Sequence, residues 1–349
     1  FGATGQSRRF RVRVDGGSPI FQEGQLDRIT LPSGRLHLSR RNPVGGWYLE
    51  TGAQTGNLTL RVAPLRLGDE VRELRIPLSL IHRHAAIAAK VASGCGVVAI
   101  TEKNGAQILV DPTLPHLVVA SGANHHASGA LPDLRDFFFA KLRFREQDNH
   151  QDWWRQVQGI ADALRGQVTD QGQTRWVFRN PQERAEARSD LEALVRQHHF
   201  VPLAPAIRNW LRFTWLHSWY SFRYPSGQHL RAIADYLFGR TGGQRNIASK
   251  INVSHAYRLD SGEWELRIWG WIPCNQPQEL HFDRNRRDEF LQDLKSLLAD
   301  SATDWRPVFG PGSTVRPTLV EWHHRDCNDR DGLAYLKELL GLSAGVGAR

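Results

Sequence analysis

The sequence predicts an α+β fold, in which an antiparallel, β-rich N-terminal region precedes a helical and then mixed helix and strand region. Two observations lead to this prediction. The first hundred or so residues contain short segments of alternating apolar and polar character separated by turn residues, such as Phe10 to Val14. Helical spacing follows, and strands return near residue 250. We therefore expect a β-rich domain at 1–120, a mixed domain with an aromatic and basic centre at 131–342, and a flexible tail at 343–349.

The N-terminal region is expected to consist mainly of hairpins. Asn104-Gly105 suits the two central positions of a type I′ turn, which makes the hairpin around it the clearest. An Ala-rich stretch at 79–91 favours one short helix among the strands. The expected hairpins pair 29–31 with 36–38, 47–50 with 58–62, and 97–100 with 107–110.

Helices are expected to dominate the middle of the chain. The best supported begins at Asn180-Pro181, where an N-cap residue precedes a proline and Glu183 lies three residues after the cap. The other segments have apolar residues at helical spacing. The predicted helices are 134–144, 152–164, 181–198, 207–222 and 229–238.

Strands return in the last third of the chain. Asp260-Ser261-Gly262 separates two segments of alternating character and predicts a hairpin. A helix, a further strand and a last helix are expected to follow. The predicted segments are strands 255–259 and 264–271, helix 286–298, strand 318–322 and helix 332–340.

The chain is strongly basic. It has 349 residues, a formal net charge of +9 and a pI near 9.9, and only six of its 45 basic residues are lysine. Such a charge favours nucleic acid or an acidic protein as partner. No apolar run is long enough to span a bilayer. The three cysteines are far apart, so we expect no disulfide framework and a cytoplasmic protein.

Aromatic and basic residues concentrate between Ala206 and Pro273, which contains six of the twelve tryptophans. In the strand at 264–271, alternation places Arg267, Trp269 and Trp271 on one face. Exposed aromatic rings beside arginine are typical of proteins that stack single-stranded bases. The alternative is that helices cover both faces of this strand and that the tryptophans are core residues.

A Gly- and Arg-rich loop lies between the two aromatic segments, at 239–250. Its cations Arg240, Arg245 and Lys250 are our candidates for phosphate contacts. The loop lacks the Gly-Lys-Ser/Thr of a Walker A motif, and no G-x-G-x-x-G follows a strand in this chain. An ordinary surface loop is the alternative explanation.

Potential metal ligands gather near the C-terminus. His323, His324, Asp326 and Cys327 lie within five consecutive positions after a predicted strand. Histidine and aspartate can bind a divalent ion and so activate a water molecule. Solvated histidines at a strand end are the alternative. Other paired histidines, at 82/84, 125/126 and 198/199, offer further ligands, but the sequence does not show how far they lie from His323 in the fold.

Three functional hypotheses follow from these features. The first is a nucleic-acid-binding protein of a bacterial mobile-element or defence type that needs no cofactor. The second is a metal-dependent hydrolase or nuclease that uses His323, His324 and Asp326, with a divalent metal as cofactor. The third is an assembly subunit with a basic surface for an acidic protein partner. Phosphate binding weakens steeply with salt, whereas a metal enzyme responds to chelators.

Overall fold

A computed structural model gives the fold of this chain. Its described residues are 10–17, 58–64, 75–84, 133–145, 152–157, 160–161, 167–170, 173–176, seven positions within 181–196, 199–224, 229–240, 247–274, 282–329 and 331–342.

A six-stranded antiparallel sheet organises the structure. Its path runs in the order β10, β3, β9, β8, β6, and β7 also pairs with β9. The expected α+β fold class is therefore confirmed. The strands are β3 (Phe137–Phe144), β6 (Phe200–Val201), β7 (Ile251–Val253), β8 (Ala256–Arg258), β9 (Trp264–Trp271) and β10 (Thr318–His323).

The helix predicted at 134–144 is wrong, because this segment forms the central strand β3. A single turn of 3₁₀ helix, η3 (Leu134–Asp136), precedes it and is closed by a capping box in which Asp133 accepts from the backbone N–H of Arg135. From Phe137 to Ala140 four apolar residues follow one another and all are buried. A short apolar run of this kind fits a strand covered on both faces as well as a helix, so periodicity alone misassigns it.

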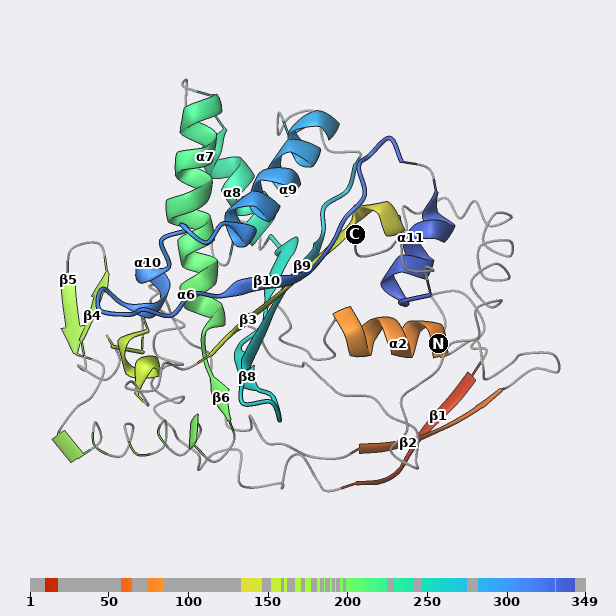
Figure 1. Ribbon diagram of the computed structural model, residues 1–349, viewed down its shortest axis with the longest axis horizontal. Coiled ribbons are helices and arrows are strands. Elements are labelled where there is room, and N and C mark those ends of the chain that lie inside the picture. Colours follow the sequence, from red (N-terminus) through yellow and green to blue (C-terminus); the bar gives the residue numbers. More distant parts are fainter. Residues whose placement is uncertain are drawn as a thin grey trace.

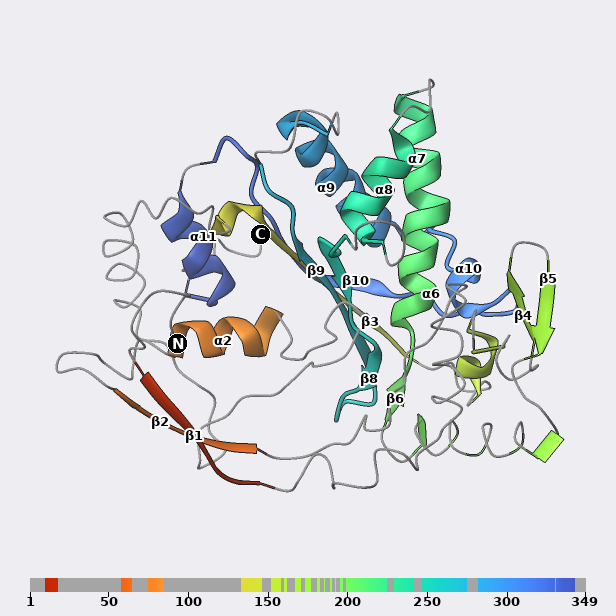
Figure 2. The same ribbon diagram turned by 180° about the vertical axis from the view of Figure 1, so that it is seen from behind.

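Helices cover the two faces of the sheet unequally. In Figures 1 and 2, α7, α8 and α9 gather on one side of the sheet, and α2 and α11 lie toward its other side. The helices are α2 (Arg75–His84), α6 (Ala204–Asn209), the π-helical η5 (Trp210–Trp215), α7 (Leu216–Arg223), α8 (Leu230–Phe238), α9 (Arg284–Ala299), α10 (Arg306–Phe309) and α11 (Gly332–Leu339).

Most predicted C-terminal elements are confirmed. The helix expected at 207–222 is continuous through α6, η5 and α7, and the predicted segments at 229–238, 264–271, 286–298 and 318–322 form α8, β9, α9 and β10. Every described position between Pro181 and Arg196 is helical. Of the helix expected at 152–164, the described residues form the 3₁₀ helix η4 (Trp153–Gln156) and are helical at 160–161. The short strands β4 (Gln167–Asp170) and β5 (Gln173–Trp176) pair with each other.

In the N-terminal region, β1 (Phe10–Gly17) pairs antiparallel with β2 (Leu58–Pro64). The strand expected at 58–62 is confirmed, but its described partner is β1 and not the segment at 47–50. The expected helix at 79–91 starts earlier, at Arg75, and is described as far as His84. The other two predicted hairpins and the boundary expected between the two domains lie outside the described residues.

The two faces of the sheet have different chemistry. The face toward α6 to α9 carries the main core, with Phe138, Leu142, Leu266 and Ile268 fully buried. The opposite face has a smaller apolar cluster, in which Trp269 packs with aromatic and leucine residues of β3 and α11. The remainder of that second face is polar and partly buried. Burial of polar groups is costly unless they are paired, so this half of the sheet is where a functional site is expected.

A buried arginine joins the ends of three adjacent strands, β10, β3 and β9. Arg287 of α9 is 0% exposed, and its guanidinium donates to the backbone carbonyls of Arg135, Ile272 and Arg325. These carbonyls lie just before β3, just after β9 and just after β10. The neighbouring Asp288 bonds Arg287 and accepts from the backbone N–H of Cys327 at 2.9 Å. One turn of α9 therefore sets the relative position of three strands.

The same corner contains a disulfide between Cys274 and Cys327, whose Cα atoms are 5.4 Å apart. The expectation that no disulfide forms is therefore wrong for these two residues. They are separated by 53 positions in the sequence, and no local spacing indicates their pairing. Asp136 supports the bond from the side of β3 by accepting from the backbone N–H of Cys274 at 2.9 Å.

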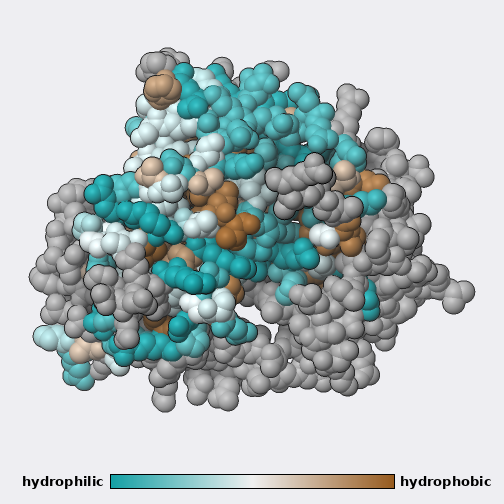
Figure 3. Space-filling model, viewed as in Figure 1, coloured by the Kyte–Doolittle hydropathy of each residue, from teal (hydrophilic) through white to brown (hydrophobic). Residues whose placement is uncertain are grey.

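The described surface is mostly hydrophilic in the view of Figure 3, with a small hydrophobic patch near β10. Large exposed hydrophobic residues are few among the described positions: Phe213, Phe222, Trp271 and Val320. Single exposed residues of this kind are normal on a folded protein. Within the described ranges no helix has both the length and the apolar character that a membrane crossing requires.

We predict that Arg287→Met destabilises the protein by about 3–5 kcal/mol, because three backbone carbonyls and Asp288 lose their donor together. Arg231→Met, at an exposed position of α8, should change the free energy of unfolding by less than about 0.5 kcal/mol. Urea unfolding of both variants measures the difference. Equal stabilities would contradict the role given to Arg287.

A second prediction concerns His255, which is fully buried beside β8 and accepts from the backbone N–H of Ala204. Burial lowers the pKa of His255 to about 3. Below pH 6.5 the unfolded chain binds a proton that the folded chain does not, so acid favours unfolding. As the pH falls from about 6 to about 4, protonation of this residue in the unfolded chain should lower the free energy of unfolding by about 1.4 kcal/mol per pH unit.

His255→Gln should therefore make the free energy of unfolding less dependent on pH in this window by about that slope. Urea midpoints measured at several pH values test this, with His217→Gln, at an exposed position, as the matched control. A slope that is the same in His255→Gln and in the parent protein would refute the prediction.

Candidate metal centre

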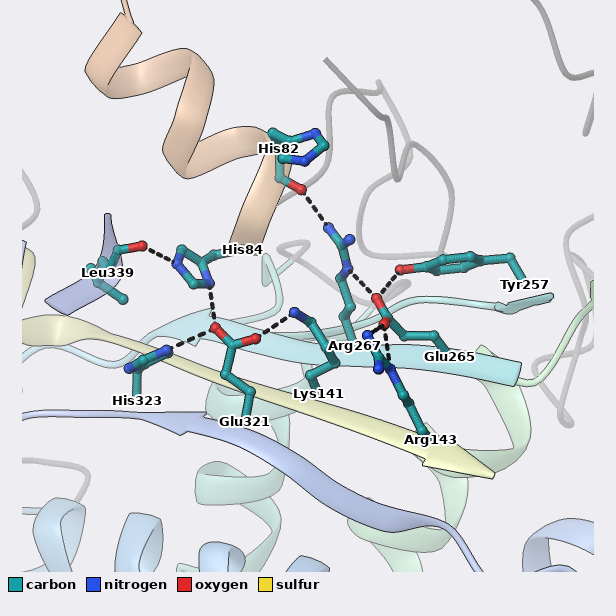
Figure 4. A network of polar contacts seen from close by, with 10 residues as sticks. All are labelled: His82, His84, Lys141, Arg143, Tyr257, Glu265, Arg267, Glu321, His323 and Leu339. Carbon is teal, nitrogen blue, oxygen red and sulfur yellow. Dashed lines mark hydrogen bonds and ion pairs between the residues drawn. The ribbon is translucent and has the colours of Figure 1, made fainter. Parts of the chain in front are cut away.

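Strand register collects polar side chains on the second face of the sheet. Glu321 of β10 lies opposite Lys141 of β3, and Lys141 lies opposite Arg267 of β9. His323, two residues after Glu321, projects from the same face of its strand. The last residue of α2, His84, approaches this row from above the sheet (Figure 4). Four elements distant in the sequence thus contribute to one cluster.

Three of these side chains present ligand atoms to a common point. His84, Glu321 and His323 each offer one nitrogen or oxygen, and these atoms all lie within 4.8 Å of one another. Nε2 of His323 is 2.9 Å from Oε1 of Glu321, and Nδ1 of His84 is 3.6 Å from the same oxygen. Two imidazoles and a carboxylate are a common ligand set for zinc.

Two adjacent residues of α11 orient both histidines. The carbonyl of Leu339 lies 2.6 Å from Nε2 of His84, and the carboxylate of Glu338 lies 2.7 Å from Nδ1 of His323. A carbonyl and an ionised carboxylate only accept hydrogen bonds, so these two ring nitrogens carry the protons. By the same reasoning Nε2 of His323, 2.9 Å from the carboxylate of Glu321, donates a hydrogen bond to it, whereas Nδ1 of His84 directs a lone pair toward Glu321. A metal ion bound at these two inner nitrogens would replace the proton on Nε2 of His323 and leave the hydrogen bonds to α11 in place. Such hydrogen bonds to the outer nitrogen are typical of metal-binding histidines.

The charge states of the cluster follow from burial and hydrogen bonding. Burial lowers the pKa of His84 to about 4, so its ring is neutral at pH 7. Burial opposes ionisation of Glu321, but hydrogen bonds from His323 and Lys141 outweigh it and lower the pKa of this carboxyl to about 2. For His323, burial lowers the pKa, but hydrogen bonds with Glu321 and Glu338 outweigh it and the net pKa is raised.

Nδ1 of His84 is the unusual atom of the cluster. It is buried, and no hydrogen-bond partner is found for it in the described part of the chain. Its separation of 3.6 Å from Glu321 is too long for a hydrogen bond. A buried acceptor without a partner costs about 1–3 kcal/mol. A cation between His84 and Glu321 would satisfy both groups.

A second polar group lies next to the cluster on the same sheet face. Glu265 of β9 is buried and accepts from Tyr257 of β8 and from Arg143 of β3, and Arg267 also lies within ion-pair distance. Burial raises the pKa of Glu265, but the hydrogen bond from Tyr257 and the nearby cations outweigh it, and the pKa is lowered. This carboxylate is therefore charged, and it holds two arginines in place beside Lys141.

Of the metal ligands expected from the sequence, only His323 belongs to this cluster. The ring of His324 instead accepts from the indole N–H of Trp322 at 2.8 Å. The carboxylate of Asp326 is 67% exposed and lies 3.5 Å from His324, and Cys327 is bonded to Cys274. The expectation that these four neighbouring residues bind one metal ion together is therefore wrong. Consecutive strand residues point to opposite faces of the sheet, so the side chains of His323 and His324 cannot lie on the same face.

The residues that sequence reasoning missed are His84, Glu321, Lys141 and Glu338. One signal was present: Glu321 and His323 are two positions apart, and alternate strand residues share a face. The approach of α2 and α11 had no such signal. His84 was noted only as one member of a histidine pair.

The nucleic-acid candidates lie in different environments. Arg267 and Trp269 are 8% and 3% exposed, so the expectation that they form an open stacking surface is wrong. Trp271 is 37% exposed and Arg240 pairs with the buried Asp235. Of the remaining candidates, Lys250 lies over the ring of Tyr236, and Arg245 lies outside the described residues. The nucleic-acid hypothesis stays a prediction.

No protein-family model, curated protein or solved structure matches this chain significantly.

The role given to α11 leads to a prediction about Glu338. If this carboxylate orients His323 for a metal, Glu338→Ala should weaken zinc binding about 10–100-fold, and Glu338→Gln should recover part of the loss because its amide oxygen still accepts a hydrogen bond. Competition with a fluorescent zinc chelator measures both constants. Lys337→Gln is the control from the same turn. Equal zinc affinities for all three variants would contradict the prediction.

Proposed function

We propose that this protein is a metal-dependent hydrolase whose metal is held by His84, Glu321 and His323. The observation that carries the proposal is the convergence of three ligand atoms, two of them from histidines that are both oriented by the hydrogen bonds they donate to α11. Zinc or a similar first-row divalent ion suits two imidazoles and a carboxylate.

A simple ion network is the main alternative to a metal. A protonated His323 between Glu321 and Glu338 would explain the positions of those three side chains. It would not explain His84, whose buried Nδ1 faces the carboxylate of Glu321 without a hydrogen bond. A cation at the common point would give Nδ1 of His84 a partner and would replace the proton between His323 and Glu321, and this favours the metal.

The number and type of ligands support catalysis over a structural role. Structural zinc sites are closed by four protein ligands, usually with cysteine, whereas catalytic sites have three protein ligands and one open position. The three ligands grouped within the described residues are two histidines and a glutamate. Glu321 and His323 are 24% and 14% exposed, so the cluster is half-buried and not sealed.

Each residue then has a distinct task. His84, Glu321 and His323 bind the ion, and Lys141 holds the second carboxylate oxygen of Glu321 by an ion pair. Glu338 fixes the ring of His323 and keeps the proton on Nδ1. A bound divalent ion would supply a water molecule that ionises near neutral pH.

The first test is zinc binding. We expect one zinc ion per chain by isothermal titration calorimetry, and at least 100-fold weaker binding in His84→Ala and His323→Ala. His324→Ala is the matched control, because it removes the adjacent histidine, which faces away from the cluster. Circular dichroism and thermal unfolding establish that each variant is folded.

Equal losses in His323→Ala and His324→Ala would support the contiguous ligand set in place of this one. No zinc binding by the folded parent protein, with no binding of manganese or cobalt, would refute the metal site. For the activity, hydrolysis of p-nitrophenyl esters should disappear with a chelator and return with added zinc.

A further inference from the structure

We infer that the substrate of this site is a phosphate ester, an inference that rests on the metal-dependent hydrolysis proposed above. A row of cations leads from the metal ligands toward solvent along β3. In addition, the cluster with a divalent ion would hold more positive than negative charge. Both features favour a substrate that carries negative charge next to the bond that is cleaved.

The row consists of Lys141, Arg143 and Arg145, at alternate positions on β3 and its continuation, so that all three extend from one face of the sheet. Their side chains are 15%, 38% and 76% exposed, in that order. Figure 4 shows Lys141 reaching Glu321 and Arg143 further along the strand. The row therefore runs from the metal ligands to the surface.

Each cation of the row has an acidic partner, which orients it without using all of its donors. Lys141 pairs with Glu321, and Arg143 directs Nε and Nη2 to Glu265. A lysine ammonium has three N–H donors and a guanidinium has five. Arg143 is more than one-third exposed and can direct Nη1 to a substrate oxygen while Glu265 holds its other edge.

Charge balance points in the same direction. The cations and carboxylates paired around the cluster are equal in number, four of each, so a divalent ion would create an excess of positive charge. Excess charge in a half-buried site is unfavourable unless a counter-charge is supplied. The groups concerned are the cations Lys141, Arg143, Arg267 and Arg325 and the carboxylates Glu265, Glu321, Asp329 and Glu338.

A phosphate ester fits these groups better than a neutral ester or amide. Guanidinium groups bind phosphate oxygens in a bidentate manner, and cations stabilise the charge on a phosphoryl group during its transfer. In the hydrolysis, a water oxygen forms a bond to phosphorus, the bond from phosphorus to the ester oxygen breaks, and the water proton ends on the departing alcohol. Lys141 and Arg143 would hold the non-bridging oxygens.

The experiment compares substrates of equal leaving group on the zinc-loaded protein. These are bis(p-nitrophenyl) phosphate, p-nitrophenyl phosphate and the neutral p-nitrophenyl acetate, and a fluorescently labelled single-stranded oligonucleotide forms a separate arm. We expect at least a tenfold higher kcat/KM for a phosphate ester than for the acetate. Cleavage of the oligonucleotide would identify a nucleic-acid source of the phosphate, and hydrolysis of the small esters alone would identify a small-molecule source.

Variants then test the row of cations. Arg143→Lys keeps the positive charge but loses the guanidinium group and its paired N–H donors. It should raise KM for the phosphate ester at least fivefold and leave KM for the acetate within twofold. Arg306→Lys is the matched control, because Arg306 pairs with Asp304 on the exposed surface away from this sheet face. Thermal unfolding establishes that both variants are folded.

The outcomes separate the two proposals. Zinc binding with hydrolysis of the acetate and no reaction of any phosphate ester would overturn the substrate class and leave the metal-dependent hydrolase standing. Phosphate-ester hydrolysis with unchanged KM in Arg143→Lys would overturn the role of the cation row. The absence of metal binding would refute both proposals together.

Discussion

The guanidinium of Arg287 is the interaction on which the arrangement of the sheet depends. It donates to backbone carbonyls at the ends of three adjacent strand regions and is itself fully buried. A buried cation is stable only when its donors are satisfied, so the three carbonyls must meet at one point. The register that places Glu321, Lys141 and Arg267 in one row is thereby coupled to a contact just beyond the end of β10, two residues after His323.

The disulfide and α11 extend this constraint to the candidate site. Cys327 lies in the connection between β10 and α11, and its bond to Cys274 ties that connection to the end of β9. The same connection leads to Glu338 and Leu339, which orient the two histidines. Fixing the start of α11 therefore restricts where its last turn can place a carboxylate and a carbonyl. A site of this kind needs such support, because a metal tolerates little error in ligand position.

The chemistry of the site follows from an unequal sheet. One face is a continuous apolar core, and the other is apolar at one end and ionic at the other. In the ionic half, paired charges and the hydrogen bonds of α11 satisfy most buried groups. Nδ1 of His84 is the exception that a cation would resolve.

Local patterns in the sequence determined the type of most C-terminal elements. The alternation at 264–271, the turn at Asp260-Ser261-Gly262 and the cap at Asn180-Pro181 each depend on neighbouring residues alone, and the elements they predict are present. The tertiary structure alone decided that β3 is a strand, that Trp269 is buried, and that His84 meets Glu321. The reason is physical: periodicity shows which residues share a face, but packing between distant segments decides what covers that face.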